Sequence, residues 1–123
     1  MSIKDYFEKS AETNEESKIS ILRTRYYRDR IEEVEDVIIN MIEKSENGKV
    51  LSVDDERKEI HFNTSKYEGV IKLTIQRYRN ISIDMYIYTP KTLPMKLPIK
   101  VIERLYKYLD SKLTFVGTSL FVQ

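Results

Sequence analysis

The chain has 123 residues, enough for one domain with a buried core, and it contains no cysteine. Disulfide bonds and thiolate metal sites are therefore excluded. A net charge of +1 argues against a general polyanion binder. The first 60 residues carry 11 basic and 16 acidic groups and the rest carry 10 and 4, so the halves should attract each other.

Residues 1–18 are rich in Glu, Lys, Ser, Asn and Thr, which predicts a flexible tail before a single domain over residues 19–123. They contain no apolar run of the signal-peptide kind. No stretch of the chain approaches the roughly 18 apolar residues of a membrane helix. We therefore expect a cytoplasmic protein without membrane contact.

Residues 19–26, ISILRTRY, alternate in the manner of a strand with one polar face. This strand would direct Arg23 and Arg25 outward, away from Leu22 and Tyr26.

A helix is predicted from about Arg28, because apolar residues then recur at helical spacing. Its early turns are acidic, which the helix dipole favours. Asn47-Gly48 supplies a left-handed stop. The apolar stripe consists of Ile31, Val34, Ile38, Met41 and Ile42.

Four strand-like runs follow, at 49–53, 57–62, 67–78 and 81–88. In the last two runs the odd-numbered apolar residues must share one face. This requires an odd number of residues in the connecting loop. Tyr78-Arg79-Asn80 fits a three-residue loop, with Asn80 accepting the left-handed conformation.

Pro98 is well placed in the first turn of a second helix. The end of the chain, LTFVGTSLFVQ, is apolar and must either dock on the domain or be presented to a partner. The predicted order is β-α-β-β-β-β-α. The economical arrangement is a two-layer α+β fold, an antiparallel sheet with both helices packed on one face.

The outer face of this sheet is the first candidate site. It would carry aromatic and basic side chains able to stack bases and neutralise phosphates, or to contact a protein or a small aromatic ligand. A solvated face, on which tyrosines serve as good strand formers, is the alternative. The residues predicted there are Arg23, Arg25, Lys72, Gln76, Tyr78, Tyr86 and Tyr88.

A basic stripe on the second helix is the other candidate, formed by Lys96, Lys100, Arg104 and Lys107 at helical spacing. It would contact phosphates or acidic partners. The alternative is a solvated face lying beside the acidic first helix.

The remaining polar motifs predict no chemistry. The glycines stand too far apart for a phosphate loop, and there is no nucleophile elbow. A lone histidine, His61, expected to point outward, cannot build a transition-metal site. Asp54-Asp55-Glu56 fits a turn better than a calcium loop. We expect no catalytic residues, no metal and no cofactor.

Asp84 stands alone in an apolar and aromatic strand. It is expected to pair with Lys72 or Arg23 across the sheet, with a carboxylate pair to Glu68 as the alternative.

The segments LRTRYY, VLSVDDERKEIHF and LPIKVIERLYKYLDSKLTFVGTSL resemble uncharacterised cytosolic proteins of Gram-positive bacteria, over roughly residues 21–121. The resemblance implies no activity and no site residues. The topology is also similar to helix-on-sheet domains of bacterial lipoproteins and TATA-box-binding repeats, an architecture that serves many functions.

The sequence thus predicts a protein-interaction or accessory module, a homodimer or a subunit, that uses its open sheet face and C-terminal tail. A nucleic-acid-binding domain using the sheet face and the basic stripe is the alternative.

Overall fold

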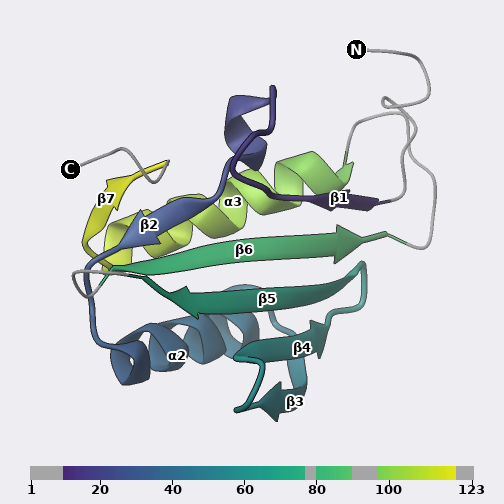
Figure 1. Cartoon of the computed structure of the whole chain (residues 1–123). Coiled ribbons are helices and arrows are strands. Elements are labelled where there is room, and N and C mark those ends of the chain that lie inside the picture. Colours follow the sequence, from purple (N-terminus) through teal and green to yellow (C-terminus); the bar gives the residue numbers. More distant parts are fainter. Residues whose placement is uncertain (1–9, 77–79, 90–96, 119–123) are drawn as a thin grey trace.

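The computed structural model describes residues 10–76, 80–89 and 97–118. Figure 1 shows a sheet whose helices cover it on one side. The elements are β1 (Ser10–Glu12), η1 (Ser20–Leu22), β2 (Arg25–Tyr27), α2 (Ile31–Asn40), η2 (Met41–Ser45), β3 (Lys49–Asp54), β4 (Glu59–Asn63), β5 (Glu68–Ile75), β6 (Ile81–Tyr88), α3 (Leu97–Lys112) and β7 (Phe115–Gly117).

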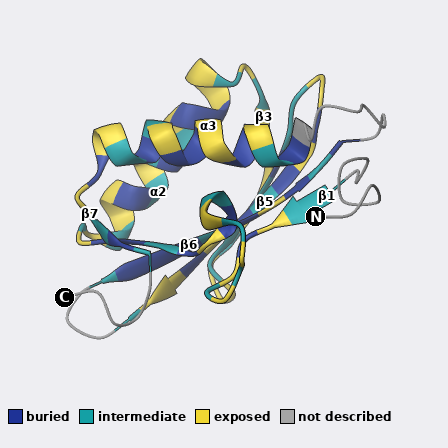
Figure 2. Cartoon of the chain, turned by 90° about the horizontal axis from the view of Figure 1, so that it is seen from above, coloured by how far each residue is buried: buried dark blue, intermediate teal, exposed yellow. Residues whose placement is uncertain are grey.

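The predicted α+β architecture is confirmed. The described strands form one antiparallel sheet in the order β3-β4-β5-β6-β2-β7. β1 and β2 share one edge of β6, β1 along Tyr86–Tyr88 and β2 along Ile81–Ile83. Figure 2 shows α2 and α3 on the same side of this sheet, which leaves its other face free of helices.

The register of β5 against β6 confirms the predicted parity. Ile71 pairs with Met85 and Ile75 with Ile81, so odd-numbered residues share one face. The Gln76 amide donates to the Asn80 carbonyl at 2.7 Å, so the pairing continues one residue beyond Ile75 and Ile81. Asn80 is therefore paired with Gln76 and does not belong to the loop in which it was predicted; Tyr78 and Arg79 lie outside the described residues.

The core lies between the apolar sides of the two helices and one face of the sheet, the face that carries the odd-numbered residues of β5 and β6 and the even-numbered residues of β4. Its fully buried side chains include Phe62 and Met85 from the sheet, Ile38 from α2 and Leu105 from α3. Asn47 has a φ of 56°, which confirms the left-handed stop after the first helix. Pro98 lies in the first turn of α3, also as predicted.

The N-terminal segment differs from the prediction. Residues 10–18 do not form a tail, because β1 pairs with β6. Thr13 follows β1 and continues the ladder: its amide donates to the Met85 carbonyl and its Oγ1 accepts from the Met85 amide, both at 2.9 Å. The predicted strand over 19–26 is instead the 3-10 turn η1 followed by the short β2.

Asp84 explains why this segment folds onto the sheet. Its Oδ1 accepts hydrogen bonds from the hydroxyls of Thr13 at 2.6 Å and Thr24 at 2.5 Å. The two threonines are 7% and 1% exposed. β6 carries no lysine or arginine, and the Asp84 carboxylate accepts its hydrogen bonds from these two hydroxyls instead. Lys72 lies directly opposite Asp84 across the sheet, as predicted, but neither Lys72 nor Arg23 forms an ion pair with it among the described residues. Glu68 lies opposite Tyr88 instead.

Glu46, just after η2, ties the first helix to the rest of the fold. Its side chain is 6% exposed. Tyr67 Oη donates to its Oε1 at 2.7 Å, and Arg104 donates Nε to Oε2 at 3.0 Å and Nη2 to Oε1. Burial alone would raise the pKa of Glu46, but the hydrogen bonds from Arg104 and Tyr67 outweigh it and hold the pKa below the ordinary 4.5.

This lowered pKa predicts a loss of stability in acid. A carboxyl whose folded pKa lies below its unfolded value contributes stability above the unfolded value, and that contribution disappears as the pH falls through the folded pKa. Glu46→Gln should cost about 1 kcal/mol at neutral pH and reduce the fall in the urea midpoint below pH 4.5. Exposed Glu43→Gln should change neither quantity. Equal acid sensitivity of both variants would contradict the assigned role.

Candidate interaction surface

The helix-free face of the sheet carries an exposed aromatic and apolar patch. One cross-strand row runs through Glu12, Tyr86, Val70, His61 and Ser52, one residue from each of β1, β6, β5, β4 and β3. Paired residues of an antiparallel sheet share a face. Since Ile60 and Phe62 are buried while His61 is partly exposed, this row lies on the outer face, as predicted for His61.

Tyr88 lies in the neighbouring row, with Ser10 on one side and Glu68 on the other. Leu51 and Tyr86 are 53% and 40% exposed. A hollow of 330 Å³ opens over this part of the sheet. We call its aromatic, apolar and imidazole side chains, which are exposed or half-buried, the tyrosine face: Leu51, His61, Val70, Tyr86 and Tyr88.

Carboxylates surround the tyrosine face. Glu12 lies directly opposite Tyr86, and Glu68 lies directly opposite Tyr88. Neither carboxylate makes a hydrogen bond or an ion pair with another residue that the structure describes. Glu59 Oε1 is 3.2 Å from His61 Nε2. The outer face around the tyrosines is therefore acidic.

Two predicted arginines do not belong to this face. Arg25 pairs with Ile83 and so points to the helix side, where Nε and Nη2 donate to Asp110 at 3.2 and 2.6 Å. Its guanidinium also stacks 3.9 Å from the centre of the Phe115 ring. Arg23 precedes β2 and donates through Nε to the Ser17 carbonyl at 3.0 Å.

Lys72, Tyr86 and Tyr88 do lie on the outer face, as predicted. Lys72 occupies a third row, between Asp84 and Glu59. The structure thus brings the tyrosines together with carboxylates and two lysines, Lys49 and Lys72, where the sequence predicted arginines.

The basic stripe belongs to the opposite layer. Lys100, Arg104 and Lys107 are exposed on α3, which covers the other face of the sheet (Figure 2). Arg104 is bound to Glu46, so its charge is compensated. Lys96 lies outside the described residues. The stripe and the tyrosine face therefore do not form one surface.

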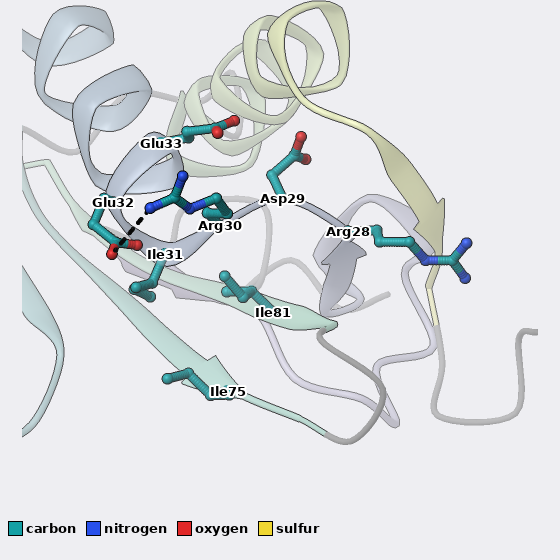
Figure 3. Close-up of a pocket in the computed structure, with 8 residues that line it drawn as sticks. All are labelled: Arg28, Asp29, Arg30, Ile31, Glu32, Glu33, Ile75 and Ile81. Atoms are coloured by element: carbon teal, nitrogen blue, oxygen red, sulfur yellow. Dashed lines mark ion pairs between the residues drawn. The ribbon is translucent and has the colours of Figure 1, made fainter.

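A larger hollow of 660 Å³ lies where α2 begins, beside the ends of β5 and β6. Figure 3 shows Ile31, Ile75 and Ile81 along one side and the charged residues above them, with the Arg28 side chain directed away.

Three of the five charged side chains around this larger hollow already have partners. Arg30 Nη2 lies 3.8 Å from Glu32 Oε1, and Asp29 accepts hydrogen bonds from the Thr114 amide and hydroxyl at 2.6 and 3.2 Å. Specific small-molecule sites need polar groups that converge on the ligand. We therefore do not assign a site here.

The described residues were also expected to hold no metal site and no membrane-spanning helix. Across residues 10–76, 80–89 and 97–118, no group of three or more His, Asp or Glu side chains is placed to hold a metal ion. Asp54 Oδ1 accepts from the Arg57 amide at 3.0 Å, as expected for turn chemistry. Neither described α-helix has the length and apolar character needed to cross a membrane.

Fold and surface together define a small α+β protein with one helix-covered face and one open, aromatic and acidic face. No protein-family model matches the chain, and neither a curated protein nor a solved structure matches it.

Proposed function

We propose that this protein is an interaction module that binds a partner protein on the tyrosine face. The observation that supports this proposal most directly is the cluster of Leu51, Tyr86 and Tyr88 on a sheet face that no helix covers. Tyrosine offers a large contact area and a polar tip, and it is enriched at protein interfaces. The five-strand platform beneath it holds these side chains in fixed positions. The proposal includes no catalytic step.

A cytoplasmic location and membership of the Gram-positive family remain parts of this proposal. The acidic surroundings favour a partner other than a second copy bound face to face, because like charges would meet. They also count against nucleic acid at this face, since phosphates would meet Glu12 and Glu68 while Arg25 is held by Asp110. The homodimer and nucleic-acid alternatives therefore lack support from this surface.

Site-specific photo-crosslinking tests the proposal. Tyr86 is replaced by p-benzoylphenylalanine, and the protein is irradiated in its native cytoplasm. Tyr108, a partly exposed tyrosine of α3 on the helix layer, is the matched control. We expect a discrete crosslinked protein from position 86 and not from position 108. The same crosslinks from both positions, or none from position 86, would refute the proposed surface.

A further inference from the structure

We propose that the partner presents an extended cationic segment to the tyrosine face, with two lysine or arginine side chains two residues apart. This inference rests on the proposed function and adds the chemistry of the partner. Each cation would lie between a tyrosine ring and the carboxylate opposite it, one at Tyr86 with Glu12 and the other at Tyr88 with Glu68.

The two tyrosine–carboxylate pairs follow from the register of β6. Glu12 belongs to β1 on one side of β6, and Glu68 belongs to β5 on the other. Side chains directly opposite each other in an antiparallel sheet have Cβ atoms about 5 Å apart. A ring and a carboxylate at that separation can both contact one ammonium or guanidinium group.

The spacing of the pairs selects an extended ligand. Tyr86 and Tyr88 are two residues apart on one strand, a distance of about 7 Å. Alternate side chains of an extended peptide repeat at the same distance and on the same side. Cationic residues at alternate positions would therefore reach both pairs, whereas adjacent cations would point to opposite sides.

Charge supports the same partner. An aromatic face attracts a cation through its quadrupole, and a nearby carboxylate adds a charge-assisted hydrogen bond. Glu12 and Glu68 have no partner among the described residues, so no existing contact must break. Two lysines of the described strands share this face. Lys72 has the carboxylates of Asp84 and Glu59 on either side in its own row, and Lys49 lies two strands from Glu68, beyond Asn63.

Peptide titration followed by amide NMR tests the inference. The probe is Gly-Ser-Lys-Val-Lys-Ser-Gly, compared with the same peptide carrying glutamate in place of both lysines and with one whose lysines are adjacent. The alternating lysine peptide should bind most tightly and shift the amides of β6 around Tyr86 and Tyr88. Equal binding of all three peptides, shifts confined to other elements, or no shifts at all would overturn the inference.

Variants separate local chemistry from net charge. Glu12→Gln with Glu68→Gln should weaken the alternating peptide about three- to fivefold, the effect of two exposed ion pairs. Glu43→Gln with Glu103→Gln makes the same change in net charge at exposed positions elsewhere and should leave the affinity unchanged. An equal loss of peptide affinity in both double variants would show that overall charge alone attracts the peptide, and it would contradict the inference.

The proposed function can survive failure of this inference. If position 86 crosslinks one protein equally well with and without Glu12 and Glu68, the tyrosine face binds a partner that is not cationic. If position 86 captures nothing, the surface itself is misassigned and both proposals fall.

Discussion

Replacing Asp110 by alanine is expected to lower the free energy of unfolding by about 2 kcal/mol, the cost of leaving buried polar groups without their hydrogen-bond acceptor. Asp110 Oδ1 accepts the Tyr27 hydroxyl at 2.6 Å in addition to the Arg25 guanidinium. Tyr27 is fully buried, and the Arg25 side chain is 19% exposed. Without the carboxylate, a buried hydroxyl and a mostly buried cation would lose their partner. Chemical denaturation measures the loss.

Two comparisons isolate the Asp110 cluster. Asp36→Ala removes an exposed carboxylate from α2 and should change stability by less than about 0.5 kcal/mol. Arg25→Ala combined with Asp110→Ala should cost less than the sum of the single changes, because the residues act as a unit. A single Asp110→Ala change as mild as Asp36→Ala would show that the cluster contributes little.

Gly69→Ala is expected to destabilise the protein by about 2 kcal/mol, although alanine usually suits a strand better than glycine. A Cβ at position 69 would lie 2.6 Å from two atoms of the Phe62 ring and 3.0 Å from Cδ1 of Ile87. Phe62 is 1% exposed and Ile87 is fully buried, so neither side chain can move aside into solvent. Thermal and urea unfolding both measure the effect.

A smaller neighbour provides the control for Gly69. In a Phe62→Leu background the added methyl group has room, so Gly69→Ala should be much less costly there than in the natural chain. Equal costs in both backgrounds would mean that the clash with Phe62 is not the cause. A stabilising Gly69→Ala change would contradict the packing outright.

The long strands were predictable because one face is buried along most of their length, although Ile75 at the end of β5 is exposed. Over β5 and β6 the two-residue period repeats often enough to place Ile71, Met85 and Tyr86 correctly. β2 has three residues and follows a 3-10 turn, so its alternation does not continue into the preceding segment. Arg25 was misplaced for this reason.

The N-terminal segment could not be predicted from local sequence. Its polar composition is typical of a tail, and the contacts that hold it, the pairing of β1 with β6 and the bonds of Thr13 and Thr24 to Asp84, join distant parts of the chain. Glu12 was therefore missing from the predicted site. Leu51 was missed as an exposed contact because a register shift between Val50 and Ser52 interrupts the regular pairing of β3.

Both proposals depend on the exposure of Tyr86 and the burial of its neighbour Met85, which cysteine alkylation measures directly. The chain contains no cysteine, so a single introduced thiol gives an unambiguous signal. In the isolated folded protein, Tyr86→Cys should react with a maleimide nearly as fast as in denaturant. Met85→Cys should react at least about 100-fold more slowly, because its labelling requires opening of the core. Rapid labelling at position 85 together with protection at position 86 would contradict the assigned face.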